Sequence, residues 1–364
     1  MSRRVVALVF GGRSVEHEVS LVSARGIFDN LDRARNEIVL VGVDREGRPR
    51  VGGEDLLAGG LERGEGTVVR WPSHRGDRAL REESTGRALT PPLDAVFPIV
   101  HGSGGEDGTL QGALTLAGIP CVGAGVLGSS LAMDKDRTRR VLERAGIPVV
   151  RDAVFEGPEA DDEPRVRTAA EALGWPVFVK PARAGSSVGI TKVRGVAELP
   201  AAIAAARAVD PKIVIEEAVP AAREVEVAVL GLWRPEASVA GEIVPGAEFY
   251  DYDAKYHDAD SQLLVPAPLE PLLAEALRAH AVRAFRELDL AGLARVDFLL
   301  SRETGRYVLN EVNTLPGFTP ISMYPRLWLA SGVPYRELLE RLIEIAIEAA
   351  AAHPLALPGA ARRR

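Results

Sequence analysis

Four polar residues alternate along two predicted strands near the C-terminal end of the chain. In GLARVDFLLSRETGRYVLNEVNTLPGFT, two apolar-rich stretches flank a turn whose glycine suits a three-residue hairpin loop. If the turn is centred on Thr304, Asp297 pairs with Glu311 and Arg295 pairs with Asn313. Because side chains alternate between the two faces of a sheet, all four point to the same side.

That face would carry two carboxylates, an amide oxygen and a guanidinium. Asp297, Glu311 and Asn313 offer the hard oxygen ligands that suit magnesium when the ion bridges phosphates. The competing interpretation is a solvated face with a cross-strand ion pair, but the flanking Val296 and Phe298 indicate a buried strand. The spacing therefore predicts a magnesium site on this hairpin.

A second segment, VFVKPARAGSSVG, places a lysine before a turn rich in glycine and serine. Such a turn can offer backbone N–H groups and hydroxyls to phosphates, with Lys180 as a point charge. The segment does not match the P-loop pattern, which occurs nowhere in the chain. Alone it would more often be an ordinary turn, and the acidic hairpin is what favours a phosphate-binding role.

Three further segments carry carboxylates or glycines beside predicted strands. In KIVIEEAV, the predicted strand ends in two adjacent glutamates. The backbone and carboxylates there could hydrogen-bond the edge of an adenine and a ribose. The ordinary alternative is that these are exposed acids at the end of a strand. In HGSGGEDG, four glycines in eight residues let the backbone approach a ligand closely. Ser14 is placed to cap the first helix, and Glu16 in its first turn either complements the helix dipole or binds a substrate ammonium.

The stretch GAEFYDYDAKYHDADSQL contains three of the six tyrosines of the chain and lacks both helical and strand periodicity. It predicts a long loop over 246–264, and long loops often form active-site lids. Polar aromatic residues on a loop could equally form a subunit contact.

One glycine pattern points to a different class of enzyme. GAGVLG, at 123–128, matches G-x-G-x-x-G between a short strand and a helix, and Glu143 follows at the spacing of dinucleotide-binding folds. The preceding strand, Pro120–Val122, is very short, and nothing downstream offers a hydride-transfer site. A nicotinamide-dependent oxidoreductase would also leave the acidic hairpin unexplained, so it is the weaker alternative.

Composition limits the class of protein. The net charge of −7 argues against a nucleic-acid or anionic-membrane surface, and no apolar stretch reaches the ~18 residues of a membrane helix. The single cysteine, Cys121, excludes an internal disulfide and a cysteine-based zinc site, as is typical of a reducing compartment. The apolar run Val5–Phe10 is too short for a signal peptide, so we expect a cytoplasmic protein.

The elements that must position these residues form an α/β fold of several domains, because 364 residues are too many for one hydrophobic core. Continuous apolar strands with helical crossovers predict a parallel N-terminal sheet, interrupted by a polar hairpin-and-loop excursion over 44–90. We place an N-terminal α/β domain at 1–130, a central domain at 131–222, a C-terminal domain at 223–350 and a disordered tail at 351–364.

The hydrophobic patterns also predict individual elements. The predicted strands before residue 220 are 5–10, 38–43, 95–100, 120–122, 149–155, 177–180, 189–193 and 212–217. The predicted helices are 15–31, 110–117, 134–145, 197–208, 271–288 and 335–350.

Taken together, these motifs resemble those of the D-alanine–D-alanine ligases of the ATP-grasp superfamily. The resemblance runs from the first predicted strand to the last predicted helix and rests on GGRSVEHEVS, HGSGGEDGTLQG, MDKDRTR, VKPARAGSSVG, EFYDYDAKY, GLARVDF and NEVNTLPGFT, in that order. It implies a Rossmann-like N-terminal domain and two α+β domains that sandwich ATP. It further implies D-alanine and ATP as substrates, and a homodimer.

The resemblance also implies residue roles. One departure affects the ribose contact, because this chain carries one more residue between Glu216 and Glu224 than the family pattern. By motif, the implied residues are Lys135 and Lys180 for the ATP phosphates; Glu216 and the Val219 backbone for adenine; Glu224 for ribose; Asp297, Glu311 and Asn313 for two magnesium ions, or manganese; Glu16, Ser186, Tyr256 and His101 for the first D-alanine; Arg295 and the Gly317 backbone for the oxyanion; and Lys255 and Ser322 for the second D-alanine.

The implied reaction is formation of an acyl phosphate from the first D-alanine, followed by attack of the second amine. The related D-alanine–D-lactate ligases share the NEVNTLPGFT and GLARVD motifs but carry a lid without the tyrosine of DAKY. Tyr256 therefore favours a dipeptide product. A non-catalytic ATP-binding protein on the same fold is disfavoured, since the lysines and the acidic residues are all present.

Overall fold

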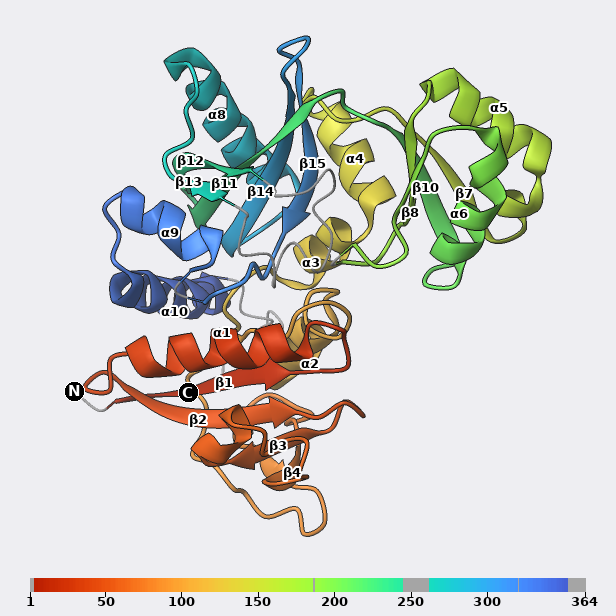
Figure 1. Cartoon of the computed structure of the whole chain (residues 1–364). Coiled ribbons are helices and arrows are strands. Elements are labelled where there is room, and N and C mark those ends of the chain that lie inside the picture. The colour runs from red at the N-terminus through yellow and green to blue at the C-terminus, as the bar shows by residue number, and fades with distance from the viewer. Residues whose placement is uncertain (1–2, 186, 245–261, 320, 353–364) are drawn as a thin grey trace, which may run out of the picture.

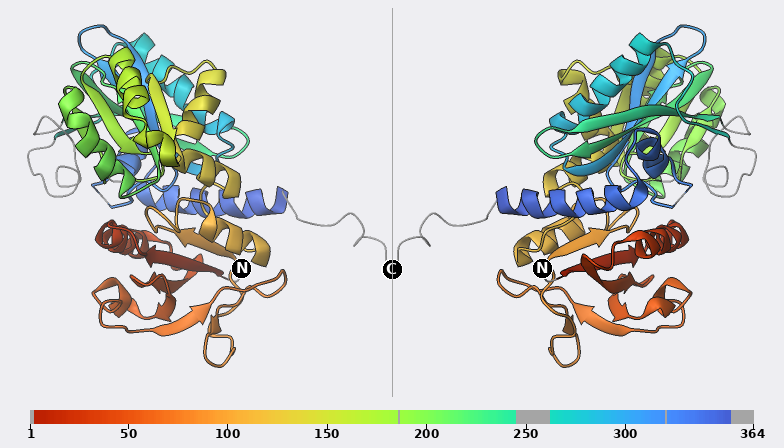
Figure 2. Two further views of the ribbon diagram at one scale, coloured as in Figure 1. Left: turned by 90° about the vertical axis from the view of Figure 1, so that its right-hand side faces the viewer. Right: turned by 90° about the vertical axis from the view of Figure 1, so that its left-hand side faces the viewer.

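The computed structural model describes residues 3–185, 187–244, 262–319 and 321–352. Three sheets follow one another along the chain, and helices pack on each (Figure 1). The N-terminal sheet lies at one end of the molecule, and the other two sheets lie at the opposite end, as all three ribbon views show (Figures 1 and 2). No helix within the described ranges is long and apolar enough to cross a membrane.

The N-terminal sheet is mixed, whereas a parallel sheet was predicted. Its order is β5-β4-β3-β2-β1-β6, in which β1, β2 and β6 are parallel and the other three strands add antiparallel. The polar region 44–90 supplies these antiparallel strands, because tight turns let successive strands pair without a crossover. The strands are β1 (Arg4–Gly11), β2 (Asn36–Val43), β3 (Pro49–Gly52), β4 (Thr67–Arg70), β5 (Arg81–Glu82) and β6 (Ala95–Pro98).

Helices α1 (His17–Asn30) and α2 (Thr109–Ala117) belong to this N-terminal part, together with the short 3-10 helix η1 (Glu54–Leu57). The predicted strand 120–122 is wrong, since only a single bridge joins Cys121 to Val96. The apolar residues there are nonetheless buried, because the segment runs beside β6 with backbone hydrogen bonds on both sides of the bridge.

The central sheet is antiparallel, with the order β7-β10-β8-β9. The predicted strand 212–217 is confirmed as β10 (Lys212–Glu217), and it is buried at all six positions because it lies between β7 and β8. The other elements are α3 (Val126–Met133), α4 (Lys135–Arg144), β7 (Asp152–Glu156), η2 (Gly157–Asp161), α5 (Glu163–Leu173), β8 (Val177–Pro181), β9 (Thr191–Val193), η3 (Val196–Glu198) and α6 (Leu199–Arg207).

The C-terminal sheet is also antiparallel, with the order β13-β12-β11-β14-β15. Residues 262–264 form β13, so the end of the predicted loop 246–264 is a strand, and 246–261 lie outside the described residues. Helix α9 was not predicted, because its eight residues are too few to show a clear period. The elements are β11 (Ala222–Gly231), β12 (Glu236–Val244), β13 (Gln262–Leu264), α8 (Pro271–Glu287), β14 (Gly292–Ser301), β15 (Tyr307–Asn313), α9 (Met323–Ala330) and α10 (Tyr335–Ala352).

Helix α10 joins the C-terminal part to the N-terminal sheet (Figure 1). Its buried Glu340 accepts hydrogen bonds from Arg4 and Asn36, at the start of β1 and β2. These contacts tie the starts of β1 and β2 to helix α10, and through it to the C-terminal part of the molecule. The first two residues of the predicted tail, 351 and 352, belong to this helix, and the rest lie outside the described residues.

Candidate active site

The hairpin of β14 and β15 places its polar residues as predicted. Asp297 pairs with Glu311, and Arg295 pairs with Asn313. Along β14, Arg295 and Asp297 are half-buried, while the residues between and beside them are in the core. The alternation of the strand therefore gives this hairpin one polar face and one core face.

A β-bulge makes this register possible. Towards the turn, Phe298 pairs with Leu309, one residue away from the register that a turn centred on Thr304 requires. The extra residue is Asn310, which lies beside Glu311, and both line the same small pocket. The predicted register is thus right at the polar face and wrong near the turn, because a bulge inserts one residue into one strand only.

Arg295 is bound by two carboxylates on this face. Its Nε and Nη2 each lie 2.7 Å from an oxygen of Asp297, and its Nε also lies 3.1 Å from Oε2 of Glu226. Asn313 donates a further hydrogen bond to Asp297, at 2.8 Å. Burial alone would lower the pKa of Arg295, but the charges of Asp297 and Glu226 outweigh it and hold that pKa well above its usual value.

The same face fits a divalent cation. Across β11, β14 and β15, Glu226 pairs with Asp297 and Asp297 pairs with Glu311, so three carboxylates stand in one row. Among the described residues, the guanidinium of Arg295 lies between Glu226 and Asp297, and Lys135 lines the same pocket as Glu311, while the row itself contributes three negative charges. Oxygen donors with excess negative charge are the ligand set that magnesium or manganese prefers. Asp297, Glu311 and Asn313 are the residues that could hold such an ion.

A lysine and the glycine-rich turn close the pocket opposite the hairpin. Lys135, the first residue of α4, donates a hydrogen bond from Nζ to the carbonyl oxygen of Ala184, at 2.7 Å. A pocket of about 50 Å³ is lined by Lys135, Ala184, Gly185 and Glu311, among others. Burial lowers the pKa of Lys135, while the charge of Glu311 opposes that shift. The predicted phosphate-binding lysine and the acidic hairpin therefore meet at one place.

Lys180 is engaged in a neighbouring buried network. Its Nζ lies 2.6 Å from Oε2 of Glu216, and Arg139 donates a hydrogen bond to the other oxygen of the same carboxylate. Burial opposes ionisation of Glu216, but Arg139 and Lys180 outweigh it and lower its pKa to about 2. Sequence reasoning missed Arg139, although it lies four residues after Lys135 and thus on the same side of α4.

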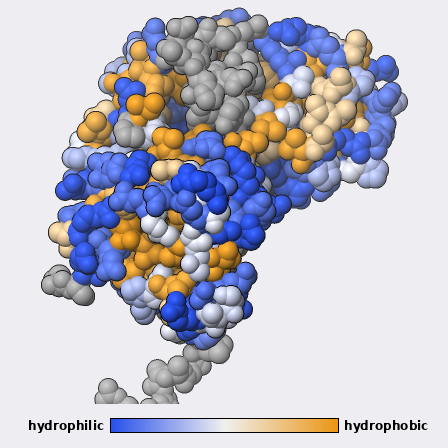
Figure 3. Space-filling model, turned by 60° about the horizontal axis from the view of Figure 1, so that its bottom comes forward, coloured by the Kyte–Doolittle hydropathy of each residue, from blue (hydrophilic) through white to orange (hydrophobic). Residues whose placement is uncertain are grey.

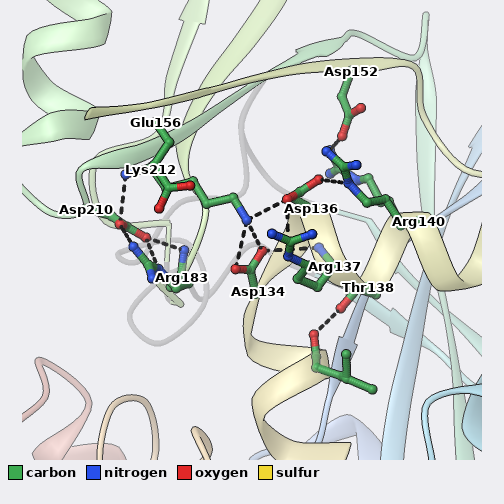
Figure 4. A network of polar contacts seen from close by, with 12 residues as sticks. Asp134, Asp136, Arg137, Thr138, Arg140, Asp152, Glu156, Arg183, Asp210 and Lys212 are labelled. Atoms are coloured by element: carbon green, nitrogen blue, oxygen red, sulfur yellow. Dashed lines mark hydrogen bonds and ion pairs between the residues drawn. The ribbon is translucent and has the colours of Figure 1, made fainter. Parts of the chain in front are cut away.

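A second polar network fixes the start of α4. Lys212 of β10 lies 2.9 Å from Asp134 and 2.6 Å from Asp136, so one buried ammonium holds the residues on both sides of Lys135 (Figure 4). Asp134 also caps the helix by accepting from the backbone N–H of Arg137. Because the two aspartates are tied to β10, Lys135 is held at a fixed place and extends towards the glycine-rich turn.

The N-terminal loops form a third wall. Helix α1 begins at His17, so Glu16 is its N-cap residue, and the expected cap Ser14 instead accepts a hydrogen bond from the N–H of Glu16 at 3.2 Å. This happens because residues 14–16 form a turn that precedes the helix. The Oε2 atom of Glu16 lies 4.0 Å from the position that a Cβ atom would take on Gly102, and 3.8 Å from the corresponding position on Gly185. Glu16 therefore lies between the HGSGGEDG loop and the glycine-rich turn.

His101 lies beside this carboxylate. Its Nδ1 is 2.9 Å from the carbonyl oxygen of Leu315, which requires the proton on that nitrogen, and its buried Nε2 makes no hydrogen bond to the described residues. Burial lowers the pKa of His101, and the charge of Glu16 opposes that shift. A neutral imidazole with an open acceptor nitrogen is thus available next to Glu16.

Sequence reasoning missed Glu106, the glutamate of HGSGGEDG. Its carboxyl accepts backbone hydrogen bonds from Gly102, at 2.6 Å, and from Leu315, at 3.2 Å, and it lines the pocket with Glu311. Burial raises the pKa of Glu106 to about 8, with a contribution from the charge of Glu16. The motif contained the signal, but the raised pKa follows from carboxylates that other segments bring near.

The remaining predicted residues fall into two groups. Gly317 and Ser322 are neighbours, since a side chain on Gly317 would begin 3.1 Å from Oγ of Ser322. Glu224 precedes Glu226 by two positions on β11 and shares its face, while Val219 follows the end of β10. The predicted residues Ser186, Lys255 and Tyr256 lie outside the described residues.

The G-x-G-x-x-G pattern has a packing role. A side chain on Gly292, at the start of β14, would begin only 2.9 Å from the backbone nitrogen of Gly123. The two glycines therefore let the segment before α3 pass close to β14. Gly123 itself has a φ of 104°, a backbone conformation that favours glycine, and a side chain on Gly128 would begin 2.6 Å from the carbonyl oxygen of Asp289, so both glycines have a structural reason without a bound dinucleotide.

Comparison with known proteins gives one family over nearly the whole chain. The family model described as D-ala D-ala ligase N-terminus matches residues 5–124, and the one described as D-ala D-ala ligase C-terminus matches residues 141–344. A D-alanine–D-alanine ligase of Thermoanaerobacter sp. (strain X514) is 48% identical over 353 residues, covering 96% of this chain and 98% of the relative. D-alanine–D-alanine ligase A of Escherichia coli (strain K12) is 42% identical over 361 residues, covering 97% and 98%.

Solved structures agree with the sequence relatives. The VanG D-Ala:D-Ser ligase from Enterococcus faecalis superposes with a TM-score of 0.85 at 36% identity, covering 95% of this chain and 100% of that chain. The D-alanine-D-alanine ligase from Coxiella burnetii gives 0.84 at 34% identity, covering 97% and 96%. With the ATP-grasp arrangement of its sheets and both family models matched, this chain belongs to the D-alanine–D-alanine ligase family.

Proposed function

We propose that this protein joins two D-alanine molecules into a dipeptide with ATP as the energy source, as a step in making peptidoglycan precursors. The observation that carries the proposal is the meeting of three walls at one pocket. Lys135 and the glycine-rich turn form one wall, the β15 side of the hairpin with Glu311 the second, and the HGSGGEDG loop with Glu106 the third, and the charge of Glu16 acts on Glu106 and His101 from beside this pocket. Phosphate, cation and amino-acid chemistry are thus within reach of each other.

The first step is transfer of the γ-phosphoryl group of ATP to the carboxylate of the first D-alanine. The glycine-rich turn and the ammonium groups of Lys135 and Lys180 would neutralise charge on the phosphates. Asp297, Glu311 and Asn313 would hold two magnesium ions, or manganese, which when bound supply charge neutralisation at the transferred phosphate. Glu16, with His101 beside it, would bind the ammonium group of this D-alanine.

The second step replaces phosphate by an amine. The amine of the second D-alanine attacks the acyl phosphate carbon, the C–O bond to phosphate breaks, and the nitrogen loses a proton. Arg295 and the N–H of Gly317 would stabilise the oxyanion that forms, an effect worth about 3 kcal/mol per donor in other enzymes. Ser322, adjacent to Gly317, and Lys255 would bind the second D-alanine.

The nucleotide is proposed to lie between the central domain, 131–222, and the C-terminal domain, 223–350. Glu216 and the backbone of Val219 would lie at adenine, and Glu224 at ribose. In the structure, the buried carboxylate of Glu216 is bound by Lys180 and Arg139, so its proposed contribution at the base would pass through these two cations. The loop 246–264, with Tyr256 orienting Glu16 through Ser186, would exclude water from the acyl phosphate.

The test is ADP release in the presence of ATP and magnesium. The substrates to compare are D-alanine alone, L-alanine alone, and D-alanine with D-lactate or D-serine. We expect turnover with D-alanine alone, with the dipeptide identified by mass spectrometry. ADP release only after D-lactate or D-serine is added would mean that the product is an ester or a mixed dipeptide. No ADP release in any mixture would refute the proposal.

We also propose that the protein is a cytoplasmic homodimer. Hydrophobic residues gather in patches bordered by hydrophilic ones on the face of Figure 3, which brings the N-terminal end of the molecule forward. On α2 and α3, Leu116, Val126 and Leu127 are 66%, 44% and 56% exposed, which is unusual for large aliphatic side chains on neighbouring helices. Light scattering should give twice the chain mass, and Leu116→Glu should shift it towards the monomer.

A further inference from the structure

The cation Arg295 lies on a carboxylate that the proposed metal ions need. Both oxygens of Asp297 are bound by the guanidinium, each at 2.7 Å, and one of them also accepts from Asn313. A divalent ion coordinated by Asp297 therefore competes with Arg295 and Asn313 for the lone pairs of this carboxylate, and its charge repels the guanidinium. The displaced guanidinium then needs another anionic partner, because an unpaired charge in this buried place is costly.

Glu226 is placed to be that partner. It is only 4% exposed, it stands opposite Asp297 on the neighbouring strand β11, and its Oε2 is already 3.1 Å from Nε of Arg295. The residue directly opposite Arg295 on β11 is Ala228, whose small side chain leaves room for the guanidinium to lean diagonally towards Glu226. Arg295 can thus transfer its pairing from Asp297 to Glu226 by a change of side-chain torsion.

The charges of the row favour this transfer. Among the described residues, Glu226 and Asp297 both bind the guanidinium of Arg295, and Glu311 stands beside Asp297. Once cations neutralise Asp297 and Glu311, they also repel Arg295, and Glu226 becomes the strongest remaining attraction for it. The arginine would then be held on the β11 side of the hairpin face.

We propose that Glu226 is a positioning residue that receives Arg295 from Asp297 when the metal ions bind, and keeps it aligned for the oxyanion. This inference rests on the proposed function, in which Arg295 stabilises the oxyanion. In the metal-free protein, Arg295 occupies the place of a cation on Asp297. Glu226 does not touch substrate, and its effect on the reaction passes through Arg295.

The experiment compares Glu226→Gln with Glu242→Gln. Glu242 is a matched control, because it is equally buried in the same sheet and is bound by Arg223 in a two-point pair at 2.8 Å and 2.7 Å, away from the hairpin face. Two quantities are measured on each variant: the Kd of Mn²⁺ by electron paramagnetic resonance with a non-hydrolysable ATP analogue, and kcat with the KM of ATP. Arg295→Gln and the double variant with Glu226→Gln complete the set.

We expect Glu226→Gln to weaken Mn²⁺ binding about tenfold and to lower kcat about ten- to a hundredfold, with the KM of ATP changed less than about threefold. Glu242→Gln should leave Mn²⁺ binding at the wild-type value. Arg295→Gln removes the competing cation and should tighten Mn²⁺ binding, and adding Glu226→Gln to it should change the Kd less than about twofold.

Two results would overturn the proposal. Wild-type Mn²⁺ affinity and kcat in Glu226→Gln would mean that Arg295 needs no second partner. A tenfold loss of Mn²⁺ affinity that persists in the Arg295→Gln background would mean that Glu226 acts by its charge alone. If Glu226→Gln folds poorly, Glu226→Asp replaces it, with smaller shifts expected in the same directions. Because Mn²⁺ binding needs no D-alanine, it tests this inference even if ADP release refutes the proposed function.

Discussion

Two clusters of charge lie close together in this protein, and they differ in how their charges balance. On the hairpin face, Glu226, Asp297 and Glu311 stand in one row, Arg295 binds the first two, and Arg295 and Asp297 remain half-buried. In the neighbouring network, Glu216 is buried between two cations and both of its oxygens are bound. The first cluster places three carboxylates side by side, whereas the second surrounds one carboxylate with two cations.

This difference predicts that the hairpin face serves cation binding and that the Glu216 network serves the stability of the fold. A row of carboxylates with too few cations destabilises the fold through repulsion, and it gains when a divalent ion arrives. A buried carboxylate with matched partners is costly to disrupt, because removing it leaves buried cations unpaired. We therefore expect a substitution on the hairpin face to lower activity without loss of stability, and a substitution in the Glu216 network to lower the free energy of unfolding.

The largest effect is expected for Glu311→Gln on the hairpin. The change should lower kcat by about a thousandfold or more, because an oxygen ligand and a charge at the transferred phosphate are lost. The urea midpoint should stay the same or rise, since one repelling charge is removed. ADP release and urea unfolding measure the two quantities. Glu303→Gln, at the exposed turn of the same hairpin, is the control, and normal turnover in Glu311→Gln would remove the hairpin from the reaction.

The next effect concerns Glu216→Gln in the balanced network. Loss of the charge that pairs Arg139 and Lys180 should lower the free energy of unfolding by about 3 kcal/mol. The pKa of Glu216 is lowered in the fold from its usual 4.5 to about 2, so its contribution is present above pH 4.5 and is lost as the pH falls towards 2. Urea unfolding from pH 2 to 7 should thus be less steeply pH-dependent in the variant. Equal stability at pH 7 would show that the two clusters do not differ.

A pH-dependent effect with the opposite sign is expected for Glu106. Its pKa is raised in the fold from 4.5 to about 8, so the stability that it supports is complete below pH 4.5 and is lost as the pH rises through 8. Glu106→Gln mimics the protonated acid, and the variant should lose less stability than the wild type between pH 5 and 8. Thermal unfolding of the ligand-free proteins measures this. Parallel curves would mean that Glu106 is ionised in the fold.

The smallest effect is expected for Gly317→Ala, which changes volume and no charge. The new methyl group would begin 3.1 Å from Oγ of Ser322, so this side chain must shift by a few tenths of an ångström. We expect the KM of the second D-alanine to rise about two- to fivefold with stability nearly unchanged. Initial rates at varied concentrations of D-alanine check this. An unchanged KM would show that the side chain of Ser322 moves aside without an effect on D-alanine binding.

Much of the hairpin face could be predicted because it depends on local rules. Asp297 and Glu311 are separated by one turn, and the period of two along each strand puts them on one face whatever packs beyond it. The bulge at Asn310 could not be predicted, since no glycine or proline marks it in the sequence. The register near the hairpin turn and the cap of the first helix were both predicted wrongly. Both depend on the exact boundary of an element, which small shifts in hydrogen bonding decide.

The partners of each charge could not be predicted in the same way. Arg139 and Glu216 are 77 residues apart, and Glu106 receives a hydrogen bond from Leu315, 209 residues away. Which carboxylate is bound by which cation depends on how α4 packs on β10 and how the N-terminal loops meet β15. Glu226 acquires its significance only because β11 lies beside β14.

The sequence alone determined the kinds of residue at the site, the polar face of the hairpin and the family to which the chain belongs, because motifs and strand periodicity are local properties. Only the tertiary structure decided that Glu216 is held between two cations, that Glu106 has a raised pKa and that Arg295 lies between Asp297 and Glu226. Ionisation and pairing depend on burial and on distances between segments far apart in the chain, and these exist only once the sheets have packed together.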